Sequence, residues 1–322
     1  MRRAAASCAL AIAATAAHAQ WLPQKGVEIV AMSGPGGAND VIARAIQRHL
    51  QQLRLVGVPI TVSNRPGAGG VIAWNYLNQH AGEGTLLSVS PINLLTEHIA
   101  GASPITWTDV TPIALLFSEY VAFSVRPDSA LKDGGDLVRR LKGDPGSVTF
   151  AVAAALGGAN HIATALAMKA AGVDIRRLKF VVFSSGAQSL AAVMGGHVDV
   201  AVNPVSGAAP QMQAGRVRVV AVSSPQRLPG TVSPVPTWKE QGVDAVFSSF
   251  RGVIGPKGMT PEQVAYWEGV LAKMARSEEW KREMERNYWE SSFAGAAEAA
   301  RFLAREYERL RAVLGELGLA RR

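Results

Sequence analysis

The chain has 322 residues, 48% of them hydrophobic, and a formal net charge of +8 at pH 7. This length and composition provide for a sizeable hydrophobic core, and suit two lobes better than one. The single cysteine, Cys8, lies in the N-terminal apolar stretch, which excludes disulfides, a cysteine nucleophile and a cysteine metal site from the rest of the chain. The basic residues are not interleaved with aromatic residues, which argues against a nucleic-acid partner.

The N-terminal residues have the order of a secretory signal peptide. Arg2 and Arg3 precede an alanine-rich apolar run, 4–17, which is followed by a small-x-small sequence ending at Ala19. The alternative is a transmembrane anchor, but the run is shorter than the roughly 20 residues that cross a bilayer. We therefore expect residues 1–19 to be a signal peptide cleaved near Ala19, and the mature chain to be periplasmic.

From Val27 onward, short β-branched runs alternate with segments of helical periodicity. This alternation is typical of βα units that feed a mostly parallel sheet, so the predicted fold class is α/β. Between residues 41 and 53 the apolar side chains recur every three or four positions, as on an amphipathic helix. The expected strands are 27–32, 60–63, 86–89, 121–125, 148–152, 180–183, 198–202 and 217–222.

The last third of the chain is predicted to be mainly helical. Thr260 and Pro261 have the residue types of an N-cap and a first helical residue, and an apolar periodicity follows them. A second long helix is expected over 296–314. We expect both helices to pack on the first lobe.

Two segments are candidates for crossings between the lobes. They are a polar break at 118–120 and an extended run at 245–254. Two such crossings would form a hinge. The predicted domains are lobe 1, formed by 20–120 and 250–322, and lobe 2, formed by 121–249.

Three glycine-rich loops follow predicted strands: 33–40 (SGPGGAND), 64–70 (NRPGAGG) and 156–161 (LGGANH). Ligands of open α/β sheets bind beyond the carboxyl ends of the strands. Glycines let backbone N–H groups approach a ligand closely, and the start of the following helix favours an anion. A tight βα turn is the alternative for any one loop. Three such loops at equivalent positions predict a cleft for a small carboxylate.

Motifs of nucleotide binding, catalysis and metal binding are missing. The first loop lacks the Lys-Ser/Thr ending of a P-loop, and no G-x-G-x-x-G opens a helix after a strand. No G-x-S-x-G elbow or H-E-x-x-H helix is present, and the histidines are scattered without metal-ligand spacing. We expect no catalytic residues, no metal and no cofactor, so the protein is not predicted to be an enzyme.

For each of four charged or titratable residues, the sequence is compatible with two roles. Arg65 and Arg251 are placed where an arginine fork could meet a carboxylate, or they could pin a loop and brace the crossover. His161 is either a structural residue at a helix start or a ligand contact. Asp40 is either a helix cap or a contact to the ligand, directly or through water.

An ordered series of motifs covers nearly the whole mature chain. It comprises Pro35, Gly36, Gly37 and Asp40, 64–70 (NRPGAGG), 85–87 (TLL), 195–199 (GGHVD), 214–218 (AGRVR), 235–237 (VPT), Gly252, Pro256 and Gly258. In this series the chain resembles the Bug family (Bordetella uptake gene family), the extracytoplasmic receptors of tripartite tricarboxylate transporters. The resemblance implies a periplasmic-binding-protein (Venus flytrap) fold, with two lobes joined by two crossing strands, and a ligand held largely by backbone N–H groups and bridging water.

Three segments depart from the family pattern. Phe-Ser-Ser at 183–185 stands where many relatives carry Tyr-Lys-Gly, Gly-Glu-Gly at 82–84 replaces Asp-Gly-Tyr, and Arg251 is atypical of the crossover. A phenol and an ammonium group are therefore lost beside the pocket. We expect the ligand to differ from those of better-known relatives.

The predicted function is capture of a small carboxylate, such as a di- or tricarboxylate, an amino-acid-like acid or an aromatic acid, by lobe closure. The expected partners are this ligand and the membrane subunits of a tripartite tricarboxylate transporter, and the protein is expected to be a monomer. Sensing for a membrane kinase, or an enzyme on the same scaffold, are the alternatives. Lobe 2 contacts at 157–161, 184–188, Asn203 and Pro204 follow from the family pattern. The predicted ligand-binding residues are Gly36, Gly37, Ala38, Asn39, Asp40, Arg65, Pro66, Gly67, Ala68, Gly69, Ser90, Gly157, Gly158, Ala159, Asn160, His161, Ser184, Ser185, Gly186, Ala187, Gln188, Asn203 and Pro204.

Overall fold

The computed structural model describes residues 21–153 and 155–321. The predicted signal peptide lies outside these residues. The strands are β1 (Val27–Ala31), β2 (Ile60–Asn64), β3 (Leu86–Ser90), β4 (Val110–Val125), β5 (Thr149–Ala153), β6 (Lys179–Phe183), β7 (Val200–Pro204), β8 (Arg218–Val222), β9 (Ser248–Pro256) and β10 (Trp289–Gly295). The helices are α1 (Ala38–Gln52), α2 (Val71–Asn78), α3 (Asn93–Ile99), α4 (Gly134–Gly143), α5 (Ala159–Ala170), α6 (Gly186–Met194), α7 (Val205–Gln213), α8 (Pro261–Arg276), α9 (Glu278–Asn287) and α10 (Ala296–Glu316). None of these helices is long and apolar enough to span a bilayer.

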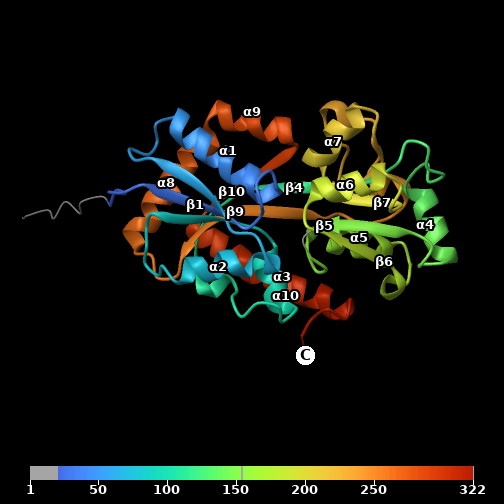
Figure 1. Ribbon diagram of the computed structural model, residues 1–322, viewed down its shortest axis with the longest axis horizontal. Coiled ribbons are helices and arrows are strands. Elements are labelled where there is room, and N and C mark those ends of the chain that lie inside the picture. Colours follow the sequence, from blue (N-terminus) through green and yellow to red (C-terminus); the bar gives the residue numbers. More distant parts are fainter. Residues whose placement is uncertain (1–20, 154, 322) are drawn as a thin grey trace, which may run out of the picture.

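The elements form two α/β lobes side by side, and β4 and β9 run lengthwise between them (Figure 1). One lobe contains the parallel strands β2, β1 and β3, and the other contains the parallel strands β6, β5 and β7. The two-lobed fold with two crossing strands is therefore confirmed. In each lobe the parallel strands bring the loops that follow them to one edge of the sheet.

The long strand β4 belongs to both lobes. From Val110 to Tyr120 it pairs antiparallel with β9, and β10 pairs with part of the same stretch. From Val121 onward its partners are β7 and β8. The change of partners falls between Tyr120 and Val121, where the sequence predicts the border between the lobes.

Several sequence predictions need correction. All eight expected strands are present, but 121–125 is only the end of β4, and the sheet is mixed rather than mostly parallel, because β4 runs antiparallel to β7, β8, β9 and β10. Strand β10 and helix α9 were not predicted. The helices expected after Thr260 and over 296–314 are present as α8 and α10.

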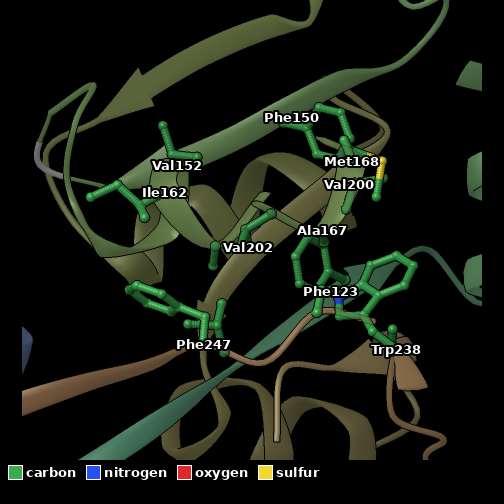
Figure 2. Close-up of a cluster of buried hydrophobic side chains, with 14 of the residues drawn as sticks. Phe123, Phe150, Val152, Ile162, Ala167, Met168, Val200, Val202, Trp238 and Phe247 are labelled. Carbon is green, nitrogen blue, oxygen red and sulfur yellow. The ribbon is translucent and has the colours of Figure 1, made fainter. Parts of the chain in front are cut away.

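Lobe 2 has a hydrophobic core against one face of its sheet, where alternate residues of β5 and β7 point to the same side (Figure 2). Phe123 of β4 meets Trp238 edge to face, with 4.9 Å between ring centroids, and both side chains are fully buried. Phe150 and Val200 on the neighbouring strands are also fully buried. Each such side chain contributes about 1.5–3 kcal/mol through burial, so this core holds the ends of β5 and β7 in place.

Helix α10 lies at the border of the lobes and does not pack on lobe 1 alone. It packs against α3 and β4, and its buried Leu310 and Leu314 share a hydrophobic core with lobe 2 residues such as Ile162. Near its C-terminal end, Glu316 pairs with Lys169 of α5. The expectation that α10 packs on the first lobe is thus incomplete, because its last turns also reach lobe 2.

A buried ion pair joins the two crossing strands. The Arg251 guanidinium of β9 pairs with Glu119 of β4, and the side chains are 7% and 4% exposed. Arg251 also donates to the Oγ of Ser249 at 2.9 Å. This arrangement is the bracing alternative that the sequence left open for Arg251.

We expect Glu119→Gln to lower the free energy of unfolding by about 3 to 5 kcal/mol, because it leaves the buried Arg251 charge without its partner. The double variant with Arg251→Met should lose less than the single variant. Urea unfolding monitored by tryptophan fluorescence measures both. Glu278→Gln, in an exposed pair with Lys281, is the matched control and should change little. Equal losses from Glu119→Gln and Glu278→Gln would contradict the bracing role.

Candidate functional site

Asp40 braces the loop between β1 and α1. Its carboxylate accepts hydrogen bonds from the backbone N–H of Gly36 at 2.8 Å, from Nδ2 of Asn64 at 2.8 Å and from Nε of Arg44 at 2.9 Å. Burial opposes ionisation, but the hydrogen bonds, that of Arg44 foremost, outweigh it and hold the pKa of Asp40 below its ordinary value. Asp40 therefore fixes the first loop and, through Asn64, ties it to the second.

The loop between β5 and α5 of lobe 2 repeats this arrangement. The sequence Gly-Gly-Ala-Asn occurs at 36–39 and again at 157–160. The first glycine of each has a positive φ, 75° and 85°, and the second is the N-cap of its helix, with φ −73°, ψ 163° and φ −72°, ψ 171°. In lobe 2, Nδ1 of His161 accepts from the N–H of Gly157 at 2.9 Å, as Asp40 does from Gly36. This short internal repeat was not predicted from the sequence.

The two matched turns leave backbone donors at the starts of α1 and α5. A glycine N-cap has no side chain with which to satisfy the first N–H groups of a helix. In α1 the N–H of Asp40 donates to the Oγ of Ser33 at 3.1 Å, so Ala38 and Asn39 supply the remaining early N–H groups. These donors and the positive end of the helix dipole favour an anion in each lobe.

His161 is neutral at pH 7. Its side chain is 6% exposed, its ring meets Phe180 edge to face at 4.4 Å, and burial lowers its pKa to about 4. Because Nδ1 accepts a hydrogen bond, the proton of the neutral ring is on Nε2. These contacts are those of the structural role that the sequence proposed for His161 as one alternative.

The second loop, 64–70, owes its shape to residues with positive φ. Gly67, Gly69 and Gly70 have φ values of 126°, 63° and 117°. The Arg65 guanidinium lies 3.3 Å from the centroid of the Tyr76 ring and 3.9 Å from Oε1 of Glu28. It therefore contacts residues of α2 and β1. These contacts match the alternative in which Arg65 pins its own loop.

Helix α3, which follows β3, adds two residues that were not predicted as part of the site. A β-carbon on Gly69 would lie 2.5 Å from the Glu97 carboxyl carbon, and one on Gly158 would lie 3.7 Å from Nδ2 of Asn93. The same Asn93 amide is 3.5 Å from Oε1 of Glu97. Asn93 and Glu97 therefore connect the second loop of lobe 1 to the glycine turn of lobe 2. The two residues are four positions apart, and this spacing puts both on one face of α3. The spacing was the signal in the sequence that could have indicated them.

The remaining lobe 2 positions lie at the starts of α6 and α7. Ser185 caps α6 by accepting from the N–H of Gln188 at 3.3 Å, and Ser184 donates to the Gln188 side chain at 2.7 Å. Asn203, at the end of β7, accepts from the Oγ of Ser189 at 2.9 Å. Pro204 is the N-cap residue of α7.

Four predicted site residues have buried polar atoms without a hydrogen-bond partner in the described part of the chain. They are Oδ1 of Asn39, Nε of Arg65, Oγ of Ser90 and Nδ2 of Asn203. Arg65, Ser90 and Asn203 lie at or next to the carboxyl ends of β2, β3 and β7, and Asn39 lies in the first turn of α1, the helix that follows β1. Buried polar groups are normally hydrogen-bonded, so these atoms are candidates for contact with a ligand or water.

Residues 21–153 and 155–321 contain no cluster of three or more His, Cys, Asp or Glu side chains arranged to hold a metal ion. The predicted site positions from Gly36 to Pro204 lie at the ends of β3 and β7, in the turns after β1, β2, β5 and β6, or in the helix starts that follow. Ala187 and Gln188 are exposed there, whereas Asn160 and Asn203 are buried.

Two α/β lobes on crossing strands, with backbone donors at the loop ends of both, define a solute-binding protein of the periplasmic-binding class. The family model described as "Tripartite tricarboxylate transporter family receptor" matches residues 42–319. The chain therefore belongs to this family of solute-binding receptors, as its resemblance to the Bug family indicated.

Named relatives and solved structures agree with this assignment. The chain is 29% identical to Protein BugT of Bordetella pertussis, over 74% of this chain and 73% of that one. The structure of periplasmic binding protein BugD has a TM-score of 0.83 at 20% identity, covering 93% of this chain and all of that one. An R. palustris protein with adipate scores 0.84 at 24% identity, over 92% and 99% of the two chains, and MatC from Rhodopseudomonas palustris with bound malate scores 0.80 at 22%, over 91% and 100%.

The buried neutral His161 makes folding sensitive to acid. Its folded pKa of about 4 lies below the ordinary value of 6.5, so between these values the unfolded chain binds a proton that the folded chain does not. This contribution to stability is complete above about pH 6.5 and is lost as the pH falls towards 4, by about 3 kcal/mol at most.

We expect His161→Asn, which keeps an acceptor near the Gly157 N–H but does not titrate, to lose less stability than the wild type between pH 7 and pH 4.5. Urea unfolding at both pH values measures the difference. His197→Asn, at an exposed histidine of lobe 2, is the control for exchanging a histidine in general. An equal loss of stability in His161→Asn and the wild type would show that His161 is not the source of the acid sensitivity.

Proposed function

We propose that this protein is a periplasmic receptor that captures a small carboxylate between its lobes and delivers it to the membrane subunits of a tripartite tricarboxylate transporter. The observation that carries the proposal is the pair of Gly-Gly-Ala-Asn turns at 36–39 and 157–160, one at a helix start in each lobe. Backbone N–H groups recognise a carboxylate by its charge and lone pairs, so no covalent chemistry is needed.

Asn203 supports the same proposal from lobe 2. Its Oδ1 accepts a hydrogen bond from Ser189, which orients the amide. Its buried Nδ2 has no partner among the described residues and can donate to a ligand. A β-carbon on Gly186 would lie 2.7 Å from that Oδ1, so Asn203 is packed against the start of α6. A carboxylate oxygen would satisfy this donor. The malate bound to MatC, which shares this fold, is a ligand with such oxygens.

We propose that the two lobes close by a hinge motion about the crossing strands β4 and β9. The lobes are taken as 20–120 with 250–322, and 121–249, with the hinge where β4 exchanges its partners. A ligand that touches donors of both lobes favours the closed state, because it binds that state more tightly than the open one. We propose that the receptor acts as a monomer after export.

A thermal-shift screen of mono-, di- and tricarboxylates and aromatic acids at constant pH tests the proposal. At least one acid should raise the melting temperature as its concentration increases, corresponding to about 2.7 kcal/mol at one hundred times its Kd. If a neutral or cationic compound stabilises the protein and no acid does, the proposal fails.

Asn203→Asp keeps the acceptor for Ser189 but replaces the free amide donor with an oxygen. We expect it to weaken binding of the stabilising acid about tenfold or more, because a hydrogen bond to a charged group is lost. Isothermal titration calorimetry measures the Kd. Asn75→Asp makes the same exchange at an exposed position of α2 and should leave the Kd unchanged. Equal affinities for Asn203→Asp and wild type would remove Asn203 from the site.

A further inference from the structure

Glu97 is a buried carboxyl group beside the glycine loop of lobe 1. It lies on α3 and is 6% exposed. Its carboxyl atoms are the nearest neighbours of a β-carbon placed on Gly69, at 2.5–2.9 Å, so the carboxyl group presses against the loop backbone. Only a glycine fits at this point of the loop.

Glu97 differs from the other buried acidic residues in having no cationic partner. Four acidic side chains are buried in the described part of the chain: Asp40, Glu97, Glu119 and Glu283. Three of them pair with an arginine: Asp40 with Arg44, Glu119 with Arg251, and Glu283 with Arg48. Within the described residues Glu97 has no ion pair, and its one hydrogen bond, from Nδ2 of Asn93, is 3.5 Å long.

The surroundings of Glu97 place this unpaired group at the meeting point of the lobes. The Asn93 amide that contacts Glu97 lies next to Gly158, the N-cap of α5 in lobe 2. A buried carboxylate without a counter-charge is costly, and a ligand that supplies one recovers this cost on binding. Burial also raises the pKa of Glu97, although the Asn93 hydrogen bond opposes this effect.

We propose that Glu97 is a specificity-determining residue that binds a cationic nitrogen of the ligand, so that the ligand class is an acid which also carries an ammonium or protonated ring nitrogen. This proposal rests on the proposed function, because the glycine turns bind the carboxylate of the same molecule. A dicarboxylate would bring a second negative charge towards Glu97, which the receptor should disfavour. A neutral, protonated Glu97 that donates to a second carboxylate is the competing outcome.

The test compares ligands that differ only in the group opposite the carboxylate. Titration calorimetry at pH 7.5 with ω-amino acids from glycine to 6-aminohexanoate, α-amino acids and pyridine carboxylates is set against dicarboxylates and monocarboxylates with the same number of methylenes. We expect at least one acid with a cationic nitrogen to bind about tenfold or more tightly than its dicarboxylate and monocarboxylate counterparts. Dicarboxylate binding with no preference for any such acid would overturn the role of Glu97 and leave the proposed function intact. Binding of no acid at all would overturn the proposed function itself.

Glu97→Gln provides the matched variant, since it keeps the shape of the side chain and removes the charge. It should weaken binding of the preferred acid about tenfold or more, and change the Kd of the plain monocarboxylate by less than about threefold. Glu298→Gln, in the first turn of α10, is the control for loss of one negative charge. The variant should also bind the dicarboxylate more tightly than the wild type does, because the repulsion is removed. Dicarboxylate binding by the wild type that is as tight as or tighter than binding by Glu97→Gln would show that Glu97 is uncharged in the complex, and would overturn the proposal, since a protonated carboxyl and an amide can both donate a hydrogen bond.

The stability of the ligand-free receptor tests the same role of Glu97 independently of any affinity. An unpaired buried carboxylate destabilises the free receptor, so Glu97→Gln should unfold at an equal or higher urea concentration than the wild type. A marked loss of stability in Glu97→Gln would show that Glu97 is satisfied within the protein, and that it has no need of a ligand cation.

Discussion

The backbone hydrogen bonds of β4 are the constraint on which the rest of this structure depends. Up to Tyr120 they are shared with β9 and β10, and from Val121 onward with β7 and β8, so one strand is built into the sheets of both lobes. A relative motion of the lobes must twist β4 where its partners change, because elsewhere it would break ladder hydrogen bonds. The buried Arg251–Glu119 pair lies next to this place.

The duplicated glycine turn shows how one geometry is kept by two different side chains. Asp40 and His161 each accept from the N–H of the first glycine, four residues earlier in the chain. Asp40 does so as an anion partnered by Arg44, whereas His161 does so as a neutral ring in an apolar environment against Phe180. The residue that braces the lobe 1 turn thus carries a negative charge, which Arg44 balances. The residue that braces the lobe 2 turn is neutral.

The strands and loops of the site could be predicted because their signals are local. β-branched runs mark β1, β5 and β8, and the glycines of 33–40, 64–70 and 156–161 mark the turns that follow strands. Strand β10 could not be predicted in this way, since its sequence, WESSFAG, has no clear alternation and it becomes a strand by pairing with β4. Glu97 could not be predicted as part of the site for a related reason. A charged residue on a short helix normally faces solvent, and its burial depends on the 64–70 loop and on α10, which packs against α3.

Helix α10 brings the C-terminal segment to the border between the lobes. Leu314 lies 3.8 Å from where a β-carbon on Gly157 would be, and Glu316 pairs with Lys169. An affinity tag or fluorophore attached after Arg321 would therefore start beside the junction that opens and closes in the proposed mechanism. If the lobes close as proposed, such a fusion would alter the balance between open and closed receptor, whereas a dye pair on α4 and α8, at opposite ends of the molecule, would report that balance from a distance (Figure 1).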